Sequence, residues 1–230
     1  MQKSMLTLVL AFSAVSTLGA QGMKHDMNAD PSNKVSNGGA PAGWAIRVDD
    51  KDSKRNMTAA DTKMAVMGGG YHVTSGPAAI YYAAKDHMLG DYSVRASLTQ
   101  TKAPMHPEGY GIFAGGKALE SPQQEYLYFL VRGDGKYMIS HRAGADVHSI
   151  LPWTDSPAVH KADAANGSAT NELVLRVTAD SAIFSVNGTR VQGWAKKGMH
   201  DWVSDGHAGL RVNHNLDVHV GAFEAKPDKK

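Results

Sequence analysis

The sequence contains no cysteine among its 230 residues. Disulfide bonds, cysteine-ligated zinc and thiol chemistry are therefore excluded, and stability has to come from apolar burial and backbone hydrogen bonding. A large excess of charge of one sign is lacking too, since the sequence has 24 basic and 22 acidic residues and a formal net charge of +2. An interspersed charge of this size gives no reason to expect nucleic acid or an anionic membrane surface as a partner.

Long apolar runs are also scarce. The run from Met5 to Val15 follows a basic start and is too short to span a bilayer, and no later stretch approaches about 18 apolar residues. Small residues then offer two processing sites before position 23. We therefore expect residues 1–22 to be a secretory signal peptide and the mature protein not to insert into a membrane. A cysteine-free exported chain fits the bacterial periplasm or exterior.

Helical periodicity is the third feature that the sequence has little of. No segment with a helical period exceeds about ten residues, which excludes a doubly wound parallel sheet. We expect a flexible linker at residues 23–41, one domain at 42–225 and a solvated tail at 226–230. The pattern from Thr58 to Asp61 is that of a capping box, which indicates one short helical turn.

Short strands take the place of helices. The sequence has about a dozen predicted strands, spaced as in antiparallel folds. This pattern predicts an all-β fold with two antiparallel sheets in a β-sandwich. Asn187-Gly188 is a strong hairpin signal, whereas Pro152 to Pro157 predicts a loop. Besides the two strands described next, the predicted strands are 43–48, 64–67, 71–74, 79–83, 92–101, 110–114, 147–151, 173–177, 182–186, 189–194, 208–212 and 218–224.

The stretch from Glu125 to Arg142 is the most informative one. It predicts two aromatic-rich strands that fold back on each other at Gly133-Asp134-Gly135. Side chains alternate along a strand, so one face of its first arm should be apolar core and the other should be rich in phenols. The core face holds Leu127, Phe129 and Val131, and the other holds Tyr126, Tyr128, Leu130 and Arg132.

Four stretches of the chain resemble a known group of domains. They are residues 79–82 with 90–95, residues 109–113, residues 171–177 with 184–188, and residues 206–212. Their order and character resemble the concanavalin A-like jelly-roll domains grouped with the 3-keto-disaccharide hydrolase family. The resemblance implies two curved antiparallel sheets with a sugar-facing concave side, usually in secreted bacterial proteins. Glu125 matches the acid of that family's Tyr-Glu-x-Gln pattern, while Leu127 stands at the amide position.

The phenol-rich face of the central hairpin is the predicted binding surface. Sugars present C–H faces that stack on aromatic rings and hydroxyls that pair with multidentate donors such as arginine. We predict that the ligand is a carbohydrate and that six residues contact it. They are Tyr126, Tyr128, Arg132, Arg142, His148 and Trp153. The alternative is that tyrosine and arginine merely cover a half-exposed strand, where β-propensity favours aromatic residues.

Glu125 with His141 or His148 is the candidate catalytic pair, because a carboxylate can orient and tune an imidazole for proton transfer. The alternative is a solvated charge at the start of a strand. The 11 histidines are scattered, so we expect no metal site and no cofactor in the domain. A cut after Gly22 would place His25 third in the mature chain, an arrangement that binds Cu(II) or Ni(II), although an incidental tail residue is favoured.

These patterns lead to one functional prediction with two alternatives. The prediction is an exported β-sandwich domain that recognises carbohydrate. The first alternative is a hydrolase or lyase that acts on glycosides or 3-keto-glycosides through Glu125 and a histidine. The second is a structural envelope protein without a small ligand. The sequence lacks the closely spaced Glu-x-Asp-x-x-Glu carboxylates of laminarinase-type glucanases.

Overall fold

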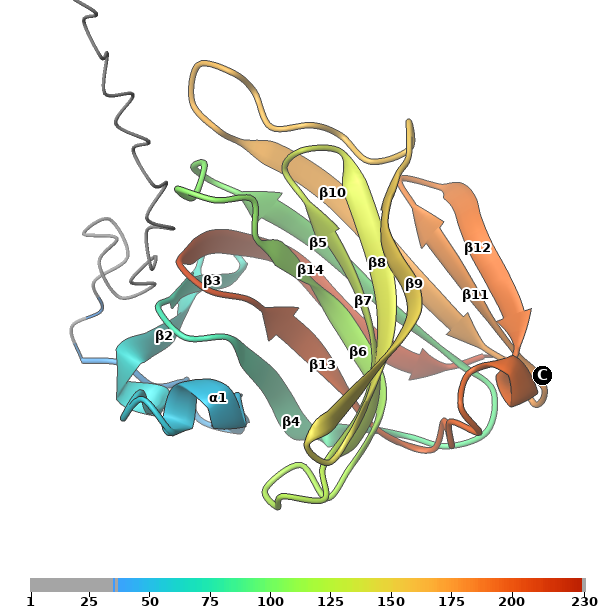
Figure 1. Ribbon diagram of the computed structural model, residues 1–230. Coiled ribbons are helices and arrows are strands. Elements are labelled where there is room, and N and C mark those ends of the chain that lie inside the picture. Colours follow the sequence, from blue (N-terminus) through green and yellow to red (C-terminus); the bar gives the residue numbers. More distant parts are fainter. Residues whose placement is uncertain (1–34, 36, 229–230) are drawn as a thin grey trace, which may run out of the picture.

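The computed structural model describes residue 35 and residues 37–228 (Figure 1). The predicted signal peptide, His25 and most of the predicted linker lie outside this range. No helix in the described range is long and apolar enough to cross a membrane. The elements are β1 (Trp44–Val48), α1 (Asp50–Ser53), η2 (Ala59–Asp61), β2 (Thr62–Met67), β3 (Gly70–Ser75), β4 (Ala79–Met88), β5 (Tyr92–Gln100), β6 (Gly109–Lys117), β7 (Glu125–Arg132), β8 (Lys136–Ala143), β9 (Asp146–Asp155), β10 (Ala169–Val177), β11 (Ser181–Val186), β12 (Thr189–Ala195), η3 (Lys196–Gly198), β13 (Gly206–Val212) and β14 (Leu216–Pro227).

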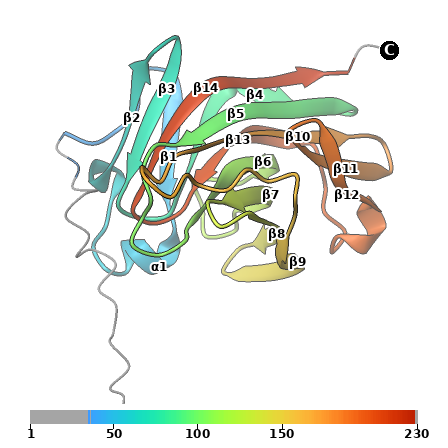
Figure 2. The same cartoon turned by 90° about the horizontal axis from the view of Figure 1, so that it is seen from above.

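The strands form two seven-stranded sheets that lie against each other (Figure 2). One has the order β1-β4-β13-β6-β7-β8-β9 and is named the β7 sheet; the other has the order β12-β11-β10-β5-β14-β3-β2 and is named the β5 sheet. Every pairing between neighbouring strands is antiparallel. The predicted all-β, two-sheet sandwich is therefore confirmed.

The main core lies between the two sheets. Alternate residues of β5, including Val94 and Leu98, meet alternate residues of β7, including Leu127 and Phe129, and all four are at most 1% exposed. A second apolar cluster lies on the opposite side of the β7 sheet, which we name the outer face. Its buried members are Ile80, Tyr82, Phe113, Leu119, Tyr126, Tyr128 and Leu130. The predicted division of the β7 side chains between two faces is confirmed.

The predicted turns are present with the expected backbone conformations. In the hairpin between β11 and β12, Asn187 has φ 49° and Gly188 has φ 78°, as a tight turn with two left-handed residues requires. Gly135 has φ 89° between β7 and β8. Thr58 and Asp61 cap the short η2 helix reciprocally, so that prediction is confirmed as well.

Several strand boundaries differ from the predicted ones, and one of these differences places a predicted site residue in a strand. Pro152 and Trp153 do not lie in a loop, because β9 continues through them to Asp155. β9 is an edge strand, where a proline without an N–H donor removes no ladder bond. The aromatic ring of Trp153 is therefore fixed by a sheet.

Candidate functional site

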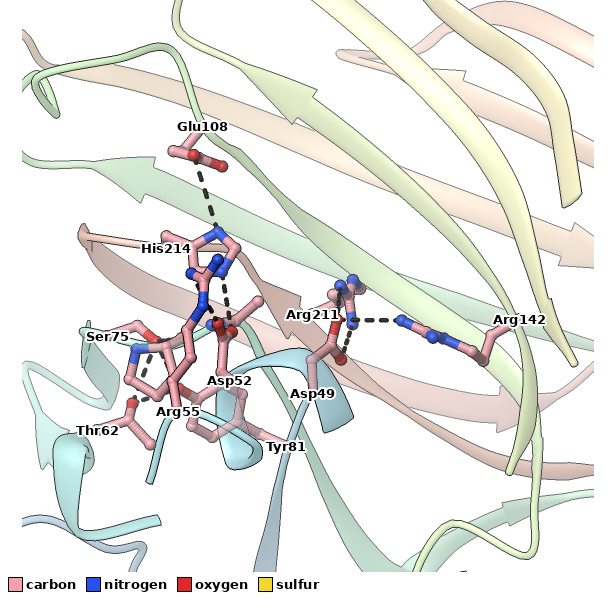
Figure 3. A network of polar contacts seen from close by, with 12 residues as sticks. Asp49, Asp52, Arg55, Thr62, Ser75, Tyr81, Glu108, Arg142, Arg211 and His214 are labelled. Carbon is pink, nitrogen blue, oxygen red and sulfur yellow. Dashed lines mark hydrogen bonds and ion pairs between the residues drawn. The ribbon is translucent and has the colours of Figure 1, made fainter. Parts of the chain in front are cut away.

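A buried ion cluster on the outer face is centred on Asp49, the residue between β1 and α1 (Figure 3). Its carboxylate accepts hydrogen bonds from Arg211 at 2.8 and 2.9 Å and from Arg142 at 3.1 Å. Arg211 also donates to the Tyr126 hydroxyl at 2.9 Å and lies 4.9 Å above the ring of Tyr128. The cluster thus covers the two rings that the sequence predicts as the floor of a sugar site.

Charge pairing outweighs burial in this cluster. Arg142 and Arg211 are only 7% and 5% exposed. Burial alone would raise the pKa of Asp49, but the positive charges and hydrogen bonds of these arginines hold its pKa at about 2. The same carboxylate raises the pKa of Arg211 against the opposing effect of burial. All three groups are charged at neutral pH, so each depends on the others for compensation.

A second ion cluster fixes the other side of α1. His214 Nε2 lies 2.8 Å from Asp52, and His214 Nδ1 lies 3.9 Å from Glu108 (Figure 3). Asp52 is 2% exposed and also accepts a 3.0 Å bond from the backbone N–H of Ala78. Burial alone would lower the pKa of His214, but the two carboxylates raise it to about 9. The two clusters together tie the segment at residues 49–52 to the sheet.

The predicted binding residues fall into two groups on the outer face and one outlier. Tyr126, Tyr128 and Arg142 are together but buried, with Tyr126 at 0% and Tyr128 at 5% exposure. Arg132 lies 4.6 Å from the ring of Trp153, and both side chains are partly exposed. Arg132 and Trp153 are thus the part of the predicted floor that a ligand can reach directly.

His148 is the outlier, because it pairs with His141 across β8 and β9 and shares the opposite face with it. The rings of these two histidines are 5.7 Å apart, and His200 stacks on His148 at 4.4 Å. His141 Nε2 lies 3.3 Å from Glu125, so the two residues are neighbours, while their catalytic role stays a prediction. His141 is only 3% exposed, and this burial lowers its pKa although Glu125 acts in the opposite direction.

An open hollow of about 590 Å³ lies on the outer face, beside β1 and β4. We name it the β1–β4 hollow. Its charged side chains come from three parts of the chain: Arg47 from β1, Asp50 from α1 and Glu120 from the loop between β6 and β7. Arg47 donates to Asp50 at 2.6 Å and to the carbonyl of Leu119 at 3.1 Å, so it joins α1 to that loop. The remaining lining residues are Ala45, Ile46, Val48, Ser53, Met57, Thr58, Ala59 and Tyr82.

Tyr82 and Glu120 also border a second, smaller hollow of about 260 Å³. Burial raises the pKa of Tyr82, and the negative charge of Glu120 raises it further. The ring of His207 lies 5.7 Å from that of Tyr82 and also lines the smaller hollow. Burial lowers the pKa of His207, and the neighbouring His87 lowers it further. The two hollows thus offer carboxylates and a phenol at neutral pH, which are hydrogen-bonding groups for a polyhydroxylated ligand.

Sequence reasoning missed the aspartates of the two ion clusters and the lining residues of the hollows. Asp49, Asp50 and Asp52 directly follow the first strand, and this concentration of carboxylates was the available signal. Arg47 lies between apolar neighbours in the first strand, so its side chain is expected on the face of that strand opposite theirs. Nothing in the sequence indicates that Glu120 joins them. Among the described residues, no group of histidine, aspartate and glutamate side chains could hold a metal ion.

Comparisons with known proteins identify the fold. No family model matches the sequence, and no curated protein matches it significantly. The carbohydrate-binding module CBM66 from Bacillus subtilis matches with a TM-score of 0.56 and 11% identity over 84% of this chain and 99% of that one. A Bacteroides ovatus mixed-linkage glucan GH16 protein matches with a TM-score of 0.56 and 6% identity over 80% of this chain and 94% of that one.

A family 7 alginate lyase matches with a TM-score of 0.52 and 10% identity, over 80% of this chain and 94% of the lyase. Identities this low show the architecture and leave the activity open. The predicted resemblance to concanavalin-like jelly rolls is therefore confirmed at the level of the fold, whereas membership of the 3-keto-disaccharide hydrolase family stays a prediction. This chain is a concanavalin-like, jelly-roll β-sandwich.

Proposed function

We propose that this protein is an exported carbohydrate-recognition domain whose ligand binds on the outer face of the β7 sheet. The observation that carries the proposal is the β1–β4 hollow, where Arg47, Asp50 and Glu120 converge beside the phenol of Tyr82. Groups of this kind orient sugar hydroxyls, and the hollow is open enough to admit a chain end. The fold shared with a carbohydrate-binding module supports the same proposal. The N-terminal signal-like pattern supports export.

Glycan-array screening followed by titration calorimetry tests this proposal. We expect Glu120→Gln to weaken binding of the best array ligand at least about tenfold, since a hydrogen bond to a charged group contributes roughly 1.5 to 3 kcal/mol. Glu120 is exposed on a loop, so the substitution should leave the melting temperature unchanged. Glu172→Gln on the other sheet is the matched control and should bind as the wild type does. Equal binding by all three proteins would show that the β1–β4 hollow is not the binding site.

Trp153→Ala tests the part of the outer face that the sequence predicts. If the ligand extends from the hollow to the ring beside Arg132, this variant should bind a long oligosaccharide several-fold more weakly and a disaccharide unchanged, because stacking on an aromatic ring contributes roughly 0.5 to 1.5 kcal/mol. Titrations with a length series of the same sugar measure the difference. Binding that is unaffected at every length would confine the site to the β1–β4 hollow.

Glycoside hydrolysis is the second candidate function. Asp50 and Glu120 line one hollow, and glycosidases place two carboxyl groups on either side of the scissile bond. Incubation with the oligosaccharide that binds best, followed by measurement of new reducing ends, decides between the two functions. We expect binding without turnover. Reducing ends that appear with the wild type and disappear with Glu120→Gln would make the protein a hydrolase.

A further inference from the structure

The arginines of the β7 sheet are each paired with a carboxylate of the same chain. The sheet has four of them, one each on β1, β7, β8 and β13. Each lies within ion-pair distance of an aspartate, at 2.6 Å for Arg47 and Asp50, 2.7 Å for Arg132 and Asp134, 3.1 Å for Arg142 and Asp49, and 2.8 Å for Arg211 and Asp49. A guanidinium that has a carboxylate to itself, such as that of Arg47, offers little attraction to a second one. Arg142 and Arg211 share Asp49, but both are buried.

The β1–β4 hollow carries an excess of negative charge. Its lining contains one guanidinium, from Arg47, and two carboxylates, from Asp50 and Glu120, which gives a net charge of −1. Asp50 takes up the charge of Arg47 at 2.6 Å, and the exposed Glu120 is left without a cation in the lining. An anionic sugar in the hollow would lie close to that carboxylate, and like charges at short range repel each other.

We propose that the β1–β4 hollow binds uncharged sugars and discriminates against sugars that carry carboxylate or sulfate groups. This inference rests on the proposed carbohydrate recognition and names the class of ligand for that same site. Glu120 is the residue that rejects anionic ligands, and Asp50 prevents Arg47 from attracting them. Both carboxylates still accept hydrogen bonds from the hydroxyls of a neutral sugar.

The test compares binding of matched oligosaccharides by the full-length protein. Gluco-oligosaccharides supply the neutral probe and oligogalacturonates of the same length supply the anionic probe. We expect the wild type to bind the neutral probe at least tenfold more tightly. Asp50→Asn frees Arg47 and should improve binding of the anionic probe severalfold, an effect that 500 mM salt should abolish. Asp228→Asn, which frees Arg176 on the other sheet, is the matched control and should leave the preference unchanged.

The possible results separate this inference from the proposed function. Tighter binding of the oligogalacturonate by the wild type would overturn the inference and leave carbohydrate recognition intact. An unchanged preference in Asp50→Asn, with an unchanged melting temperature, would also overturn it. Failure of the wild type to bind either probe or any array glycan would overturn the proposed function together with the inference.

Discussion

Replacing Asp49 with alanine is expected to lower the free energy of unfolding by about 3 to 5 kcal/mol, since breaking a buried ion pair leaves an uncompensated buried charge. The substitution removes the common partner of Arg142 and Arg211, which are 7% and 5% exposed. It also removes the tie that holds the start of α1 to β13 and β8. Urea unfolding at pH 7 measures the effect as a lower midpoint with an unchanged slope.

Asp50→Ala is the natural control for this experiment. Asp50 is the next residue, also pairs with an arginine, and has 36% of its side chain exposed. A partly exposed pair of this kind contributes about 0 to 1 kcal/mol, so the control should unfold close to the wild type. A double variant of Asp49→Ala with Arg211→Met should lose less than the two single variants together, because both remove the same pair. If Asp49→Ala were no more harmful than Asp50→Ala, the cluster would not stabilise the fold.

The fold could be predicted because strand alternation is a local property. Tyr126 and Phe129 are an odd number of positions apart, so strand alternation predicts that they lie on opposite faces of β7. The structure follows that rule. The two tight turns could be predicted because glycine and asparagine accept left-handed backbone conformations. The loop predicted at Pro152 was wrong because an edge strand tolerates proline, and edge position depends on the whole sheet.

The site could be predicted only in part, because it depends on contacts that sequence spacing does not reveal. Asp49 is 93 residues from Arg142 and 162 residues from Arg211. The sequence indicates that Tyr126 and Tyr128 share a face, and they do, but it cannot show that an arginine from β13 covers them. The sequence predicts His148 in the same binding surface as these tyrosines, but its pairing with His141 puts it on the other face.

Stability is expected to fall as the pH rises from 6.5 to about 9, and His214 should be the cause. The pKa of His214 is about 9 in the folded protein and near 6.5 in an unfolded chain, so the folded state keeps a proton that the unfolded state releases in this window. The contribution is fully present below pH 6.5 and is lost through pH 9. A difference of this size corresponds to an upper bound of about 3 kcal/mol, reduced by solvent screening because the side chain is 20% exposed.

The variant His214→Gln isolates this contribution from those of other titrating groups. It should be less stable than the wild type at pH 6, where Asp52 loses a cationic partner while staying 2% exposed, and nearly as stable at pH 9.5, where the wild-type imidazole is neutral. His160→Gln, at an exposed histidine, is the control, and it should show the same difference in stability between pH 6 and pH 9.5 as the wild type. Urea midpoints across the series give the result. A gap between wild type and His214→Gln that stays constant with pH would show that the His214 charge does not stabilise the cluster at Asp52.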